Sequence, residues 1–270
     1  MCELFAISAA SPTRVHYSLE EFSKHGGLTH MNKSGWGISY YHERDASVFK
    51  EAAPASDSEL VRFIANQELM SQCVVAHVRR ASVGADSPEN THPFDRELAG
   101  RTHVFAHNGS LPGIEFALPL EGSRFVPMGQ TDSEHAFCVL LDRLTTLWSA
   151  ETLPPLAPRL SLIVEFASAL RSIGTANFLY FDGDTLFAHA HKRAYDDGGV
   201  LSEPRAPGLN IASRATIVTG GLRVTAPDSD PEGVMLASVP LSAEGWSPLR
   251  EGSVVAIRAG NVVAEVPADS

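Results

Sequence analysis

The second residue of the chain is a cysteine, and it opens an apolar segment, Cys2-Glu3-Leu4-Phe5-Ala6-Ile7, that is typical of a β-strand. If Met1 is removed, Cys2 carries both a thiol and a free α-amine. An α-amine has an unperturbed pKa of about 7.7–8.0, so part of it is neutral at physiological pH and can accept the thiol proton. The two groups would supply a nucleophile and its base for acyl transfer without a separate catalytic histidine. This chemistry depends on the removal of Met1.

Cys2 also has simpler interpretations. A free cysteine is often a small buried hydrophobe, and lipidation is not expected because it needs an apolar segment upstream of the cysteine. The other cysteines, Cys73 and Cys138, are far from Cys2 and from each other in sequence, with no short metal-type spacing. The sequence therefore predicts a reducing compartment, no disulfide framework and no zinc site.

Composition narrows the class of protein. The chain has 270 residues, 44% of them hydrophobic, which is enough for a core in one large domain or two small ones. No internal repeat or long charged linker divides it, so we expect a single domain over residues 1–270. A net charge of −11 without a cluster of lysines and arginines argues against nucleic acid as a partner. Because no apolar run of about 18 residues and no signal segment occurs, we expect a cytoplasmic protein without a membrane partner.

Hydrophobic patterning predicts a mixture of strands and helices in which strands dominate. The strand candidates are residues 2–9, 35–41, 47–50, 73–80, 103–109, 177–181, 185–191, 253–258 and 262–266. One helix is expected to follow the capping pattern at 56–59 and to run to about Ser71. A second helix begins at the capping pattern 131–134, and a third covers 158–173.

Several polar residues stand at the ends of these elements, where a shared site can form: Cys2, Arg79, Asn108, Gly109 and Asp132. Each also has a structural interpretation. Asn-Gly is a common turn dipeptide, and an acid in the first turn of a helix favours the helix dipole. Arg79 and Arg80 point to opposite faces of their strand, so only one of them can enter a pocket. For Arg80 we expect a solvated or partner-facing role.

An ordered set of short motifs accompanies these residues. It comprises Met-Cys-Glu-Leu-Phe at 1–5, Ser-Gly-Trp-Gly-Ile at 34–38, Ala-His-Val-Arg-Arg-Ala-Ser at 76–82, Asn-Thr-His-Pro-Phe at 90–94, His-Asn-Gly at 107–109 and Gln-Thr-Asp-Ser-Glu at 130–134. In sequence and order they resemble the class II glutamine amidotransferases, a branch of the N-terminal nucleophile hydrolases. The chain is most similar to small stand-alone members that consist of the glutaminase domain alone. The resemblance is close over about 1–145 and looser beyond, where it includes Pro240-Leu241 and Glu244-Gly245-Trp246.

The resemblance implies a fold and a reaction. The fold is α+β, a four-layer αββα sandwich of two stacked, mainly antiparallel sheets flanked by helices. The Cys2 thiolate attacks the side-chain amide carbon of glutamine, ammonia leaves, and water hydrolyses the thioester. Asn108 and the backbone N–H of Gly109 stabilise the oxyanion. Arg79 binds the substrate α-carboxylate and Asp132 its α-ammonium.

The histidines and one loop bear on the details of the site. His189 and His191 share a face of a predicted strand, but no third ligand is placed near them, so we expect no metal and no cofactor. The motif histidines, His77, His92 and His107, are expected to shape the pocket through hydrogen bonds. Where many family members carry Ala-Thr-His-Gly after the arginine, this chain has Ala81-Ser82-Val83-Gly84. Ser82 can replace the threonine hydroxyl, but Val83 cannot replace a histidine.

Three functions remain open at the level of sequence. The chain has no room for a synthase domain, so a glutaminase would pass ammonia to a separate ammonia-accepting synthase. It can instead hydrolyse another γ-glutamyl amide, including γ-glutamyl compounds of thiol metabolism. A non-catalytic glutamine-binding regulatory module is the third possibility, and it predicts binding without turnover. The sequence makes no prediction of oligomeric state.

Overall fold

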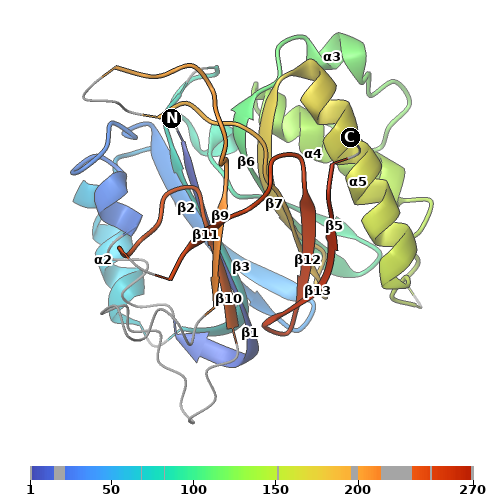
Figure 1. The fold of residues 1–270 in the computed structure, drawn as a ribbon, viewed down its shortest axis with the longest axis horizontal. Helices are drawn as coiled ribbons and strands as arrows, with labels where there is room; N and C mark the ends of the chain where they lie inside the picture. Colours follow the sequence, from blue (N-terminus) through green and yellow to red (C-terminus); the bar gives the residue numbers. More distant parts are fainter. Residues whose placement is uncertain are drawn as a thin grey trace.

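Two antiparallel sheets stack face to face, with helices against their outer faces (Figure 1). The computed structural model describes residues 2–14, 22–67, 69–81, 83–150, 152–195, 200–213, 233–243 and 245–268. The sheet orders are β11-β9-β10-β1-β4-β2-β3 and β13-β12-β8-β7-β6-β5. The α+β, four-layer αββα arrangement predicted from the resemblance is confirmed.

The strands and helices have the following bounds. The first sheet contains β1 (Glu3–Arg14), β2 (Gly35–His42), β3 (Asp45–Glu51), β4 (Met70–Arg79), β9 (Asn210–Ser213), β10 (Gly233–Ala237) and β11 (Ser247–Pro248). The second contains β5 (Phe94–Leu98), β6 (Arg101–Ser110), β7 (Thr175–Phe181), β8 (Leu186–His189), β12 (Val254–Arg258) and β13 (Asn261–Val266). The helices are α2 (Glu59–Asn66), α3 (Ile114–Ala117), α4 (Asp132–Leu144) and α5 (Leu156–Ile173), with short 3₁₀ turns at Ala55–Asp57 and Pro88–Asn90.

Alternation along β1 shows how one strand serves two cores. Leu4 and Ala6 pack between the two sheets. Phe5 and Ile7 face the opposite way, into the core that includes Val61 of α2. Successive side chains of a strand point to opposite faces, so a continuous apolar run is what a strand covered on both faces requires.

The second sheet is covered by α4 and α5. Phe105 of β6 and Phe178 of β7 form a core with Phe137 of α4 and Phe166 of α5. Phe105 and Phe137 stack with ring centroids 5.3 Å apart. Because α4 is anchored through these rings, the start of the helix is held over the end of β6, which is where the site lies. No helix among the described residues is long and apolar enough to cross a lipid bilayer.

Element boundaries depart from expectation at a few points. The helix expected to reach Ser71 is wrong at its end: α2 stops at Asn66, because Met70 already pairs with Arg14 in the first sheet. Its start is confirmed, since the Ser58 hydroxyl accepts a hydrogen bond from the Val61 N–H at 3.0 Å. The third helix begins at Leu156, two residues before the expected start. The short elements β5, β9, β10, β11 and α3 were not predicted from the sequence.

Candidate active site

Cys2 lies immediately before β1, beside the residue that follows β4. The backbone N–H of Arg80 donates to the Cys2 Sγ at 3.2 Å, and the thiol is 3.3 Å from the Arg80 carbonyl oxygen. Burial raises the pKa of the thiol, and the Arg80 N–H and the Arg79 guanidinium offset part of that rise. The resting thiol is therefore protonated and needs a base to react. Met1 lies outside the described residues.

Asn108, near the end of β6, contacts the cysteine across the two sheets. Its Nδ2 donates to the Cys2 carbonyl oxygen at 2.5 Å and lies 3.4 Å from the Ser238 Oγ. Its Oδ1 is buried and accepts no hydrogen bond from a described residue. A Cβ on Gly109 would lie 1.8 Å from the Thr175 carbonyl oxygen, so the close pairing of β6 with β7 requires glycine at this position.

Arg79 ends β4 and is buried, but its guanidinium is already engaged. Nη1 donates to Asp86 Oδ1 at 2.9 Å and to the Ser34 carbonyl at 3.3 Å, and Nη2 donates to the carbonyls of Val83 and Gly84 at 2.9 and 3.2 Å. The loop after β4 therefore wraps around this side chain. No motif in the sequence indicated this set of partners. Ser82 of the same loop lies outside the described residues, as does Glu244 of the looser C-terminal motif.

Asp132 is the first residue of α4, with Thr131 as the N-cap. Its Oδ2 accepts the Leu111 N–H at 2.7 Å, and its Oδ1 accepts the N–H of Ser133 at 2.8 Å. Ser133 Oγ also contacts His107 Nδ1 at 2.8 Å. The carboxylate is thus held both by the helix start and by the segment that leaves β6, which combines a helix-terminal and a pocket-lining position.

A small cavity of about 30 Å³ is lined by Cys2, Arg79, Gly109 and Asp132. Asn108 lies against the Cys2 carbonyl, beside this cavity. The structure thus brings together all five residues selected from the sequence, from the ends of β1, β4 and β6 and the start of α4. The cavity has room for only a water or two, so a larger ligand requires its lining to move. Val83 of the loop that wraps Arg79 is part of that lining.

Three buried histidines surround this site, and two of them depart from expectation. His107 makes its hydrogen bond to Ser133, but neither ring nitrogen of His77 or His92 has a hydrogen-bond partner among the described residues. Their rings pack with centroids 4.2 Å apart. Burial lowers the pKa of His77 to about 3 and that of His92 well below its usual value, so both are neutral packing groups.

Ligand-type side chains gather at one place among the described residues: Glu3, His25 and His30, whose candidate ligand atoms lie within 4.8 Å of one another. Glu3 accepts hydrogen bonds from His25 Nδ1 at 2.6 Å and Asn32 Nδ2 at 3.2 Å. These bonds account for the cluster without an ion. His189 and His191, the pair considered from sequence, are not part of it. The separation of Glu3 from His25 along the chain gave no local motif to detect.

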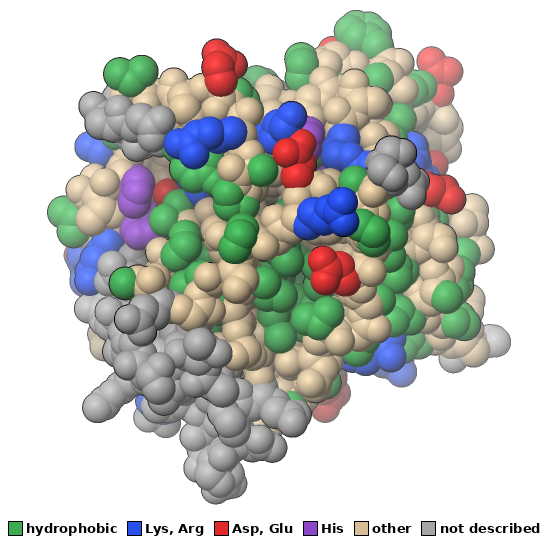
Figure 2. All heavy atoms as spheres, viewed as in Figure 1, with side chains coloured by type: hydrophobic (Ala, Val, Ile, Leu, Met, Phe, Trp, Pro, Cys, Tyr) green, Lys and Arg blue, Asp and Glu red, His purple; other side chains and the backbone are tan. Residues whose placement is uncertain are grey.

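A larger cavity of about 330 Å³ lies on the other side of Arg80. Glu3, Arg193, Tyr195 and Ser238 are among its lining residues, and Arg80 lines both cavities. Figure 2 shows Lys and Arg side chains along the upper part of the face drawn there, with acidic side chains between them. No sequence pattern indicated this second cavity, because its residues come from separate loops and strand ends that share no motif.

Known structures define the class to which this fold belongs. A structure of glutamine phosphoribosylpyrophosphate amidotransferase from B. subtilis aligns over 98% of this chain and 49% of its own, with a TM-score of 0.61 and 17% identity. The crystal structure of a predicted glutamine amidotransferase from Pseudomonas aeruginosa is also similar. It aligns over 97% of this chain and all of its own, with a TM-score of 0.66 and 28% identity. The fold is that of the N-terminal nucleophile type amidotransferases.

Sequence comparison gives the family. Residues 1–270 match the family described as glutamine amidotransferases class-II, and the chain belongs to that family. YafJ of Escherichia coli, whose name assigns it provisionally to the glutamine amidotransferases, is 40% identical over 189 residues, covering 70% of this chain and 72% of YafJ. The family resemblance drawn from the motifs is confirmed.

Proposed function

We propose that this chain hydrolyses the side-chain amide of glutamine to glutamate and ammonia through a thioester on Cys2. The observation that carries the proposal is the meeting of Cys2, Arg79, Gly109 and Asp132 around one cavity, with Asn108 bonded to the Cys2 backbone. A nucleophile, two candidate oxyanion donors and one charge of each sign form a complete set for an amino acid with a reactive side-chain amide.

The nucleophile and its base come from one residue. Removal of Met1 would free the α-amine of Cys2, and that amine would take the thiol proton that the raised thiol pKa otherwise retains. Sγ then forms a bond to the amide carbon, the carbon–nitrogen bond breaks, and the amine returns the proton to the departing ammonia. Water next adds to the thioester carbon, which releases glutamate and the free thiol.

The oxyanion formed in both steps needs donors that are already in position. The Asn108 amide nitrogen has two N–H bonds, and only its contact with the Cys2 carbonyl is short. The second N–H, whose present acceptor is Ser238 Oγ at 3.4 Å, would turn to the oxyanion, and the backbone N–H of Gly109 is the other candidate donor. The loss of one such donor typically lowers the rate about 100- to 1000-fold.

The head group of glutamine would be held by its two charges. Asp132 faces the α-ammonium, and the planar fork of Arg79 suits the α-carboxylate. Because Arg79 is bound by Asp86 and by the carbonyls of 83–84 in the free enzyme, the substrate carboxylate would replace Asp86. Binding therefore displaces the loop that follows β4, which also enlarges the cavity.

The assay is glutamate release from glutamine by protein whose N-terminus is verified as Cys2. We expect turnover by the wild type and none by Cys2→Ala. Asp132→Asn should raise KM more than it lowers kcat, whereas Asp142→Asn, on the exposed side of the same helix, should change neither. Saturable glutamine binding without turnover would identify a non-catalytic module instead. In the cell we propose a cytoplasmic enzyme that acts as one domain and passes its ammonia to a separate synthase, if glutamine is the physiological substrate.

A further inference from the structure

The larger cavity, on the Arg80 side of the site, is much larger than the release of ammonia would need. Its volume, about 330 Å³, lies within the range of small-molecule binding sites. Arg80 lines this cavity and the small cavity that contains Arg79 and Asp132, and the backbone of Arg80 contacts Cys2 Sγ. Cys2 itself lines the small cavity, and its chain neighbour Glu3 and its contact residue Arg80 line the large one. If the head group of the substrate occupies the small cavity, whatever is attached to the amide nitrogen extends into the large one.

Arg193 is the residue of this cavity that is hardest to explain without a ligand. It is 4% exposed, and the one hydrogen bond of its side chain to a described residue runs from Nη1 to the Ser238 carbonyl oxygen at 2.7 Å. Its Nε is buried with no partner, and it forms no ion pair with a described residue. Glu3 acts on it electrostatically but does not form an ion pair with it, and a buried guanidinium without an ion pair is costly. A bound anion would supply both the missing charge and the missing acceptor.

Other lining groups strengthen the positive character of the cavity. The Arg80 side chain, half-buried, makes no hydrogen bond to a described residue. The Arg205 guanidinium lies 4.2 Å from the centroid of the Tyr195 ring, and that of Arg193 lies 5.1 Å from the same centroid. Glu3 is the one acid among the described lining residues, and its oxygens are bonded to His25 and Asn32. The described lining residues thus include three arginines and one acid, and that acid already has donors of its own.

We infer that this cavity binds a carboxylate carried by the substituent on the amide nitrogen, so that the preferred substrate is a γ-glutamyl amide of an amino acid or short peptide rather than glutamine. The inference rests on the proposed function and extends it. For γ-glutamylglycine, Cys2 Sγ bonds to the γ-carbonyl carbon, the carbon–nitrogen bond breaks, and glycine leaves with the proton returned to its nitrogen. Water then hydrolyses the thioester, and the sum is γ-glutamylglycine plus water to glutamate plus glycine.

The test compares three substrates of the full chain with a verified Cys2 N-terminus: glutamine, γ-glutamyl ethylamide and γ-glutamylglycine. The last two both place a two-carbon substituent on the nitrogen, and only γ-glutamylglycine carries a carboxylate. A charge-assisted hydrogen bond to a buried guanidinium predicts a kcat/KM at least about tenfold higher for γ-glutamylglycine than for the ethylamide. The ratio of the two values is the readout, so a general loss of activity does not affect it.

Arg193→Gln tests which residue sets that ratio. We expect the preference for γ-glutamylglycine to fall to about one, while Arg62→Gln, which removes an exposed arginine of α2, keeps the wild-type ratio. If Arg193→Gln does not fold, Arg80→Gln with the same readout should lower the ratio. In either variant the effect should appear mainly in KM for γ-glutamylglycine.

The outcomes separate this inference from the proposed function. Hydrolysis of glutamine with no preference for γ-glutamylglycine over the ethylamide would overturn the inference and leave the glutaminase proposal intact. A preference that persists in both Arg193→Gln and Arg80→Gln would overturn the assignment of the cavity. No turnover of any of the three substrates would overturn both proposals.

Discussion

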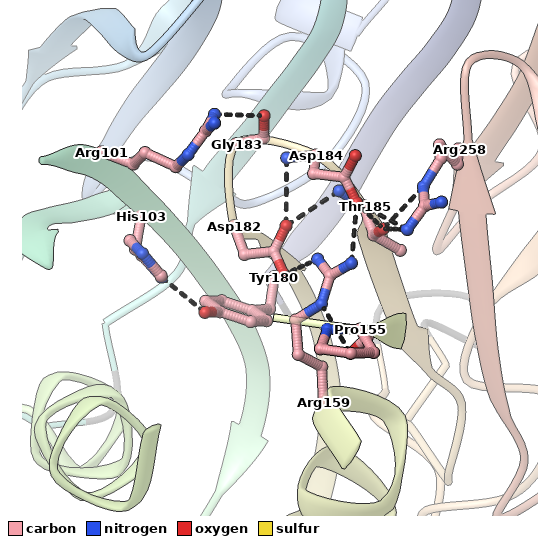
Figure 3. A network of polar contacts seen from close by, with 10 residues as sticks. All are labelled: Arg101, His103, Pro155, Arg159, Tyr180, Asp182, Gly183, Asp184, Thr185 and Arg258. Carbon is pink, nitrogen blue, oxygen red and sulfur yellow. Dashed lines mark hydrogen bonds and ion pairs between the residues drawn. The ribbon is translucent and has the colours of Figure 1, made fainter. Parts of the chain in front are cut away.

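Two buried arginines, Arg159 and Arg193, differ in the hydrogen-bond and ion-pair partners that the protein provides for them. Arg159 is 1% exposed, and its guanidinium donates to Asp182 Oδ2 at 2.6 Å, to Asp184 Oδ2 at 2.8 Å and to the Pro155 carbonyl at 3.3 Å (Figure 3). Arg193 is nearly as buried, but its guanidinium donates to a single backbone carbonyl among the described residues. The protein itself supplies the hydrogen-bond acceptors and counter-ions of Arg159, whereas a ligand would supply those that Arg193 lacks.

The Arg159 network joins α5 to the turn between β7 and β8. Asp184 also pairs with Arg258 of β12 at 2.7 Å, and Asp182 Oδ1 accepts the N–H groups of Asp184 and Thr185 (Figure 3). Burial raises the pKa of Asp182 although Arg159 opposes the rise, while bonds to Arg159 and Thr185 outweigh burial and lower the pKa of Asp184. Every charge in this region has a partner within the protein, as a structural network requires.

The largest expected effect is a loss of stability, and it should differ between Arg159 and Arg193. Arg159→Gln should lower the free energy of unfolding by about 3–5 kcal/mol, because it leaves the buried Asp182 carboxylate without its counter-ion. Arg193→Gln should cost clearly less, since no ion pair with a described residue is lost. Urea denaturation of both variants measures the difference. Equal losses would mean that Arg193 is as structural as Arg159.

Catalysis gives the next largest effect. Asn108→Ala should lower kcat about 100- to 1000-fold with little change in KM, because the oxyanion loses a donor. Asn177→Ala is the matched control: this buried asparagine of β7 bonds to the carbonyls of Asn108 and Lys192 and not to Cys2. It should cost stability and change kcat far less. The account of the oxyanion donors fails if the two variants lower kcat to a similar extent.

Buried histidines in the two regions should titrate alike, so this property should not distinguish the regions. His77 beneath the site and His103 beside Tyr180 both have a pKa lowered to about 3, with burial as the main cause. The unfolded chain therefore binds more protons than the folded one between about pH 6.5 and pH 3, and stability is lost as the pH falls through that window. His77→Phe should reduce the slope of unfolding free energy against pH by up to about 1.4 kcal/mol per unit. An unchanged slope would show that this ring is not buried and neutral.

The smallest effect concerns the loop that holds Arg79. The Asp86 side chain is 54% exposed, so its ion pair with Arg79 should contribute under about 1 kcal/mol to stability. Asp86→Ala should nevertheless lower KM for glutamine about two- to fivefold, because the substrate carboxylate no longer competes with Asp86. Steady-state kinetics measure this. A raised KM would indicate that Asp86 helps to position Arg79 for the substrate.

Local patterns were sufficient for the main elements of the fold. The continuous apolar run of β1 and the serine and threonine caps at Ser58 and Thr131 predicted where these elements start. The short strands β9, β10 and β11 were missed, because two to five residues carry too little periodicity to be recognised. The end of α2 was placed too late because pairing of Met70 in the sheet, a tertiary contact, overrides helix spacing.

The site was predictable only in part. Cys2 and the four residues around it could be selected because each sits in a motif at the end of an element. The engagement of Arg79 by Asp86, and the cavity around Arg193, depend on how loops fold back on the sheet ends. Such contacts join residues that are distant in sequence and share no period, so no local pattern encodes them.

The most direct test of the central claim is the intact mass of the purified protein before and after treatment with 6-diazo-5-oxo-norleucine, a reactive glutamine mimic. The account predicts a protein that lacks Met1 and gains one adduct, with no adduct on Cys2→Ala. Complete removal of Met1 without any adduct on the wild type would contradict a glutamine-shaped site around an N-terminal nucleophile.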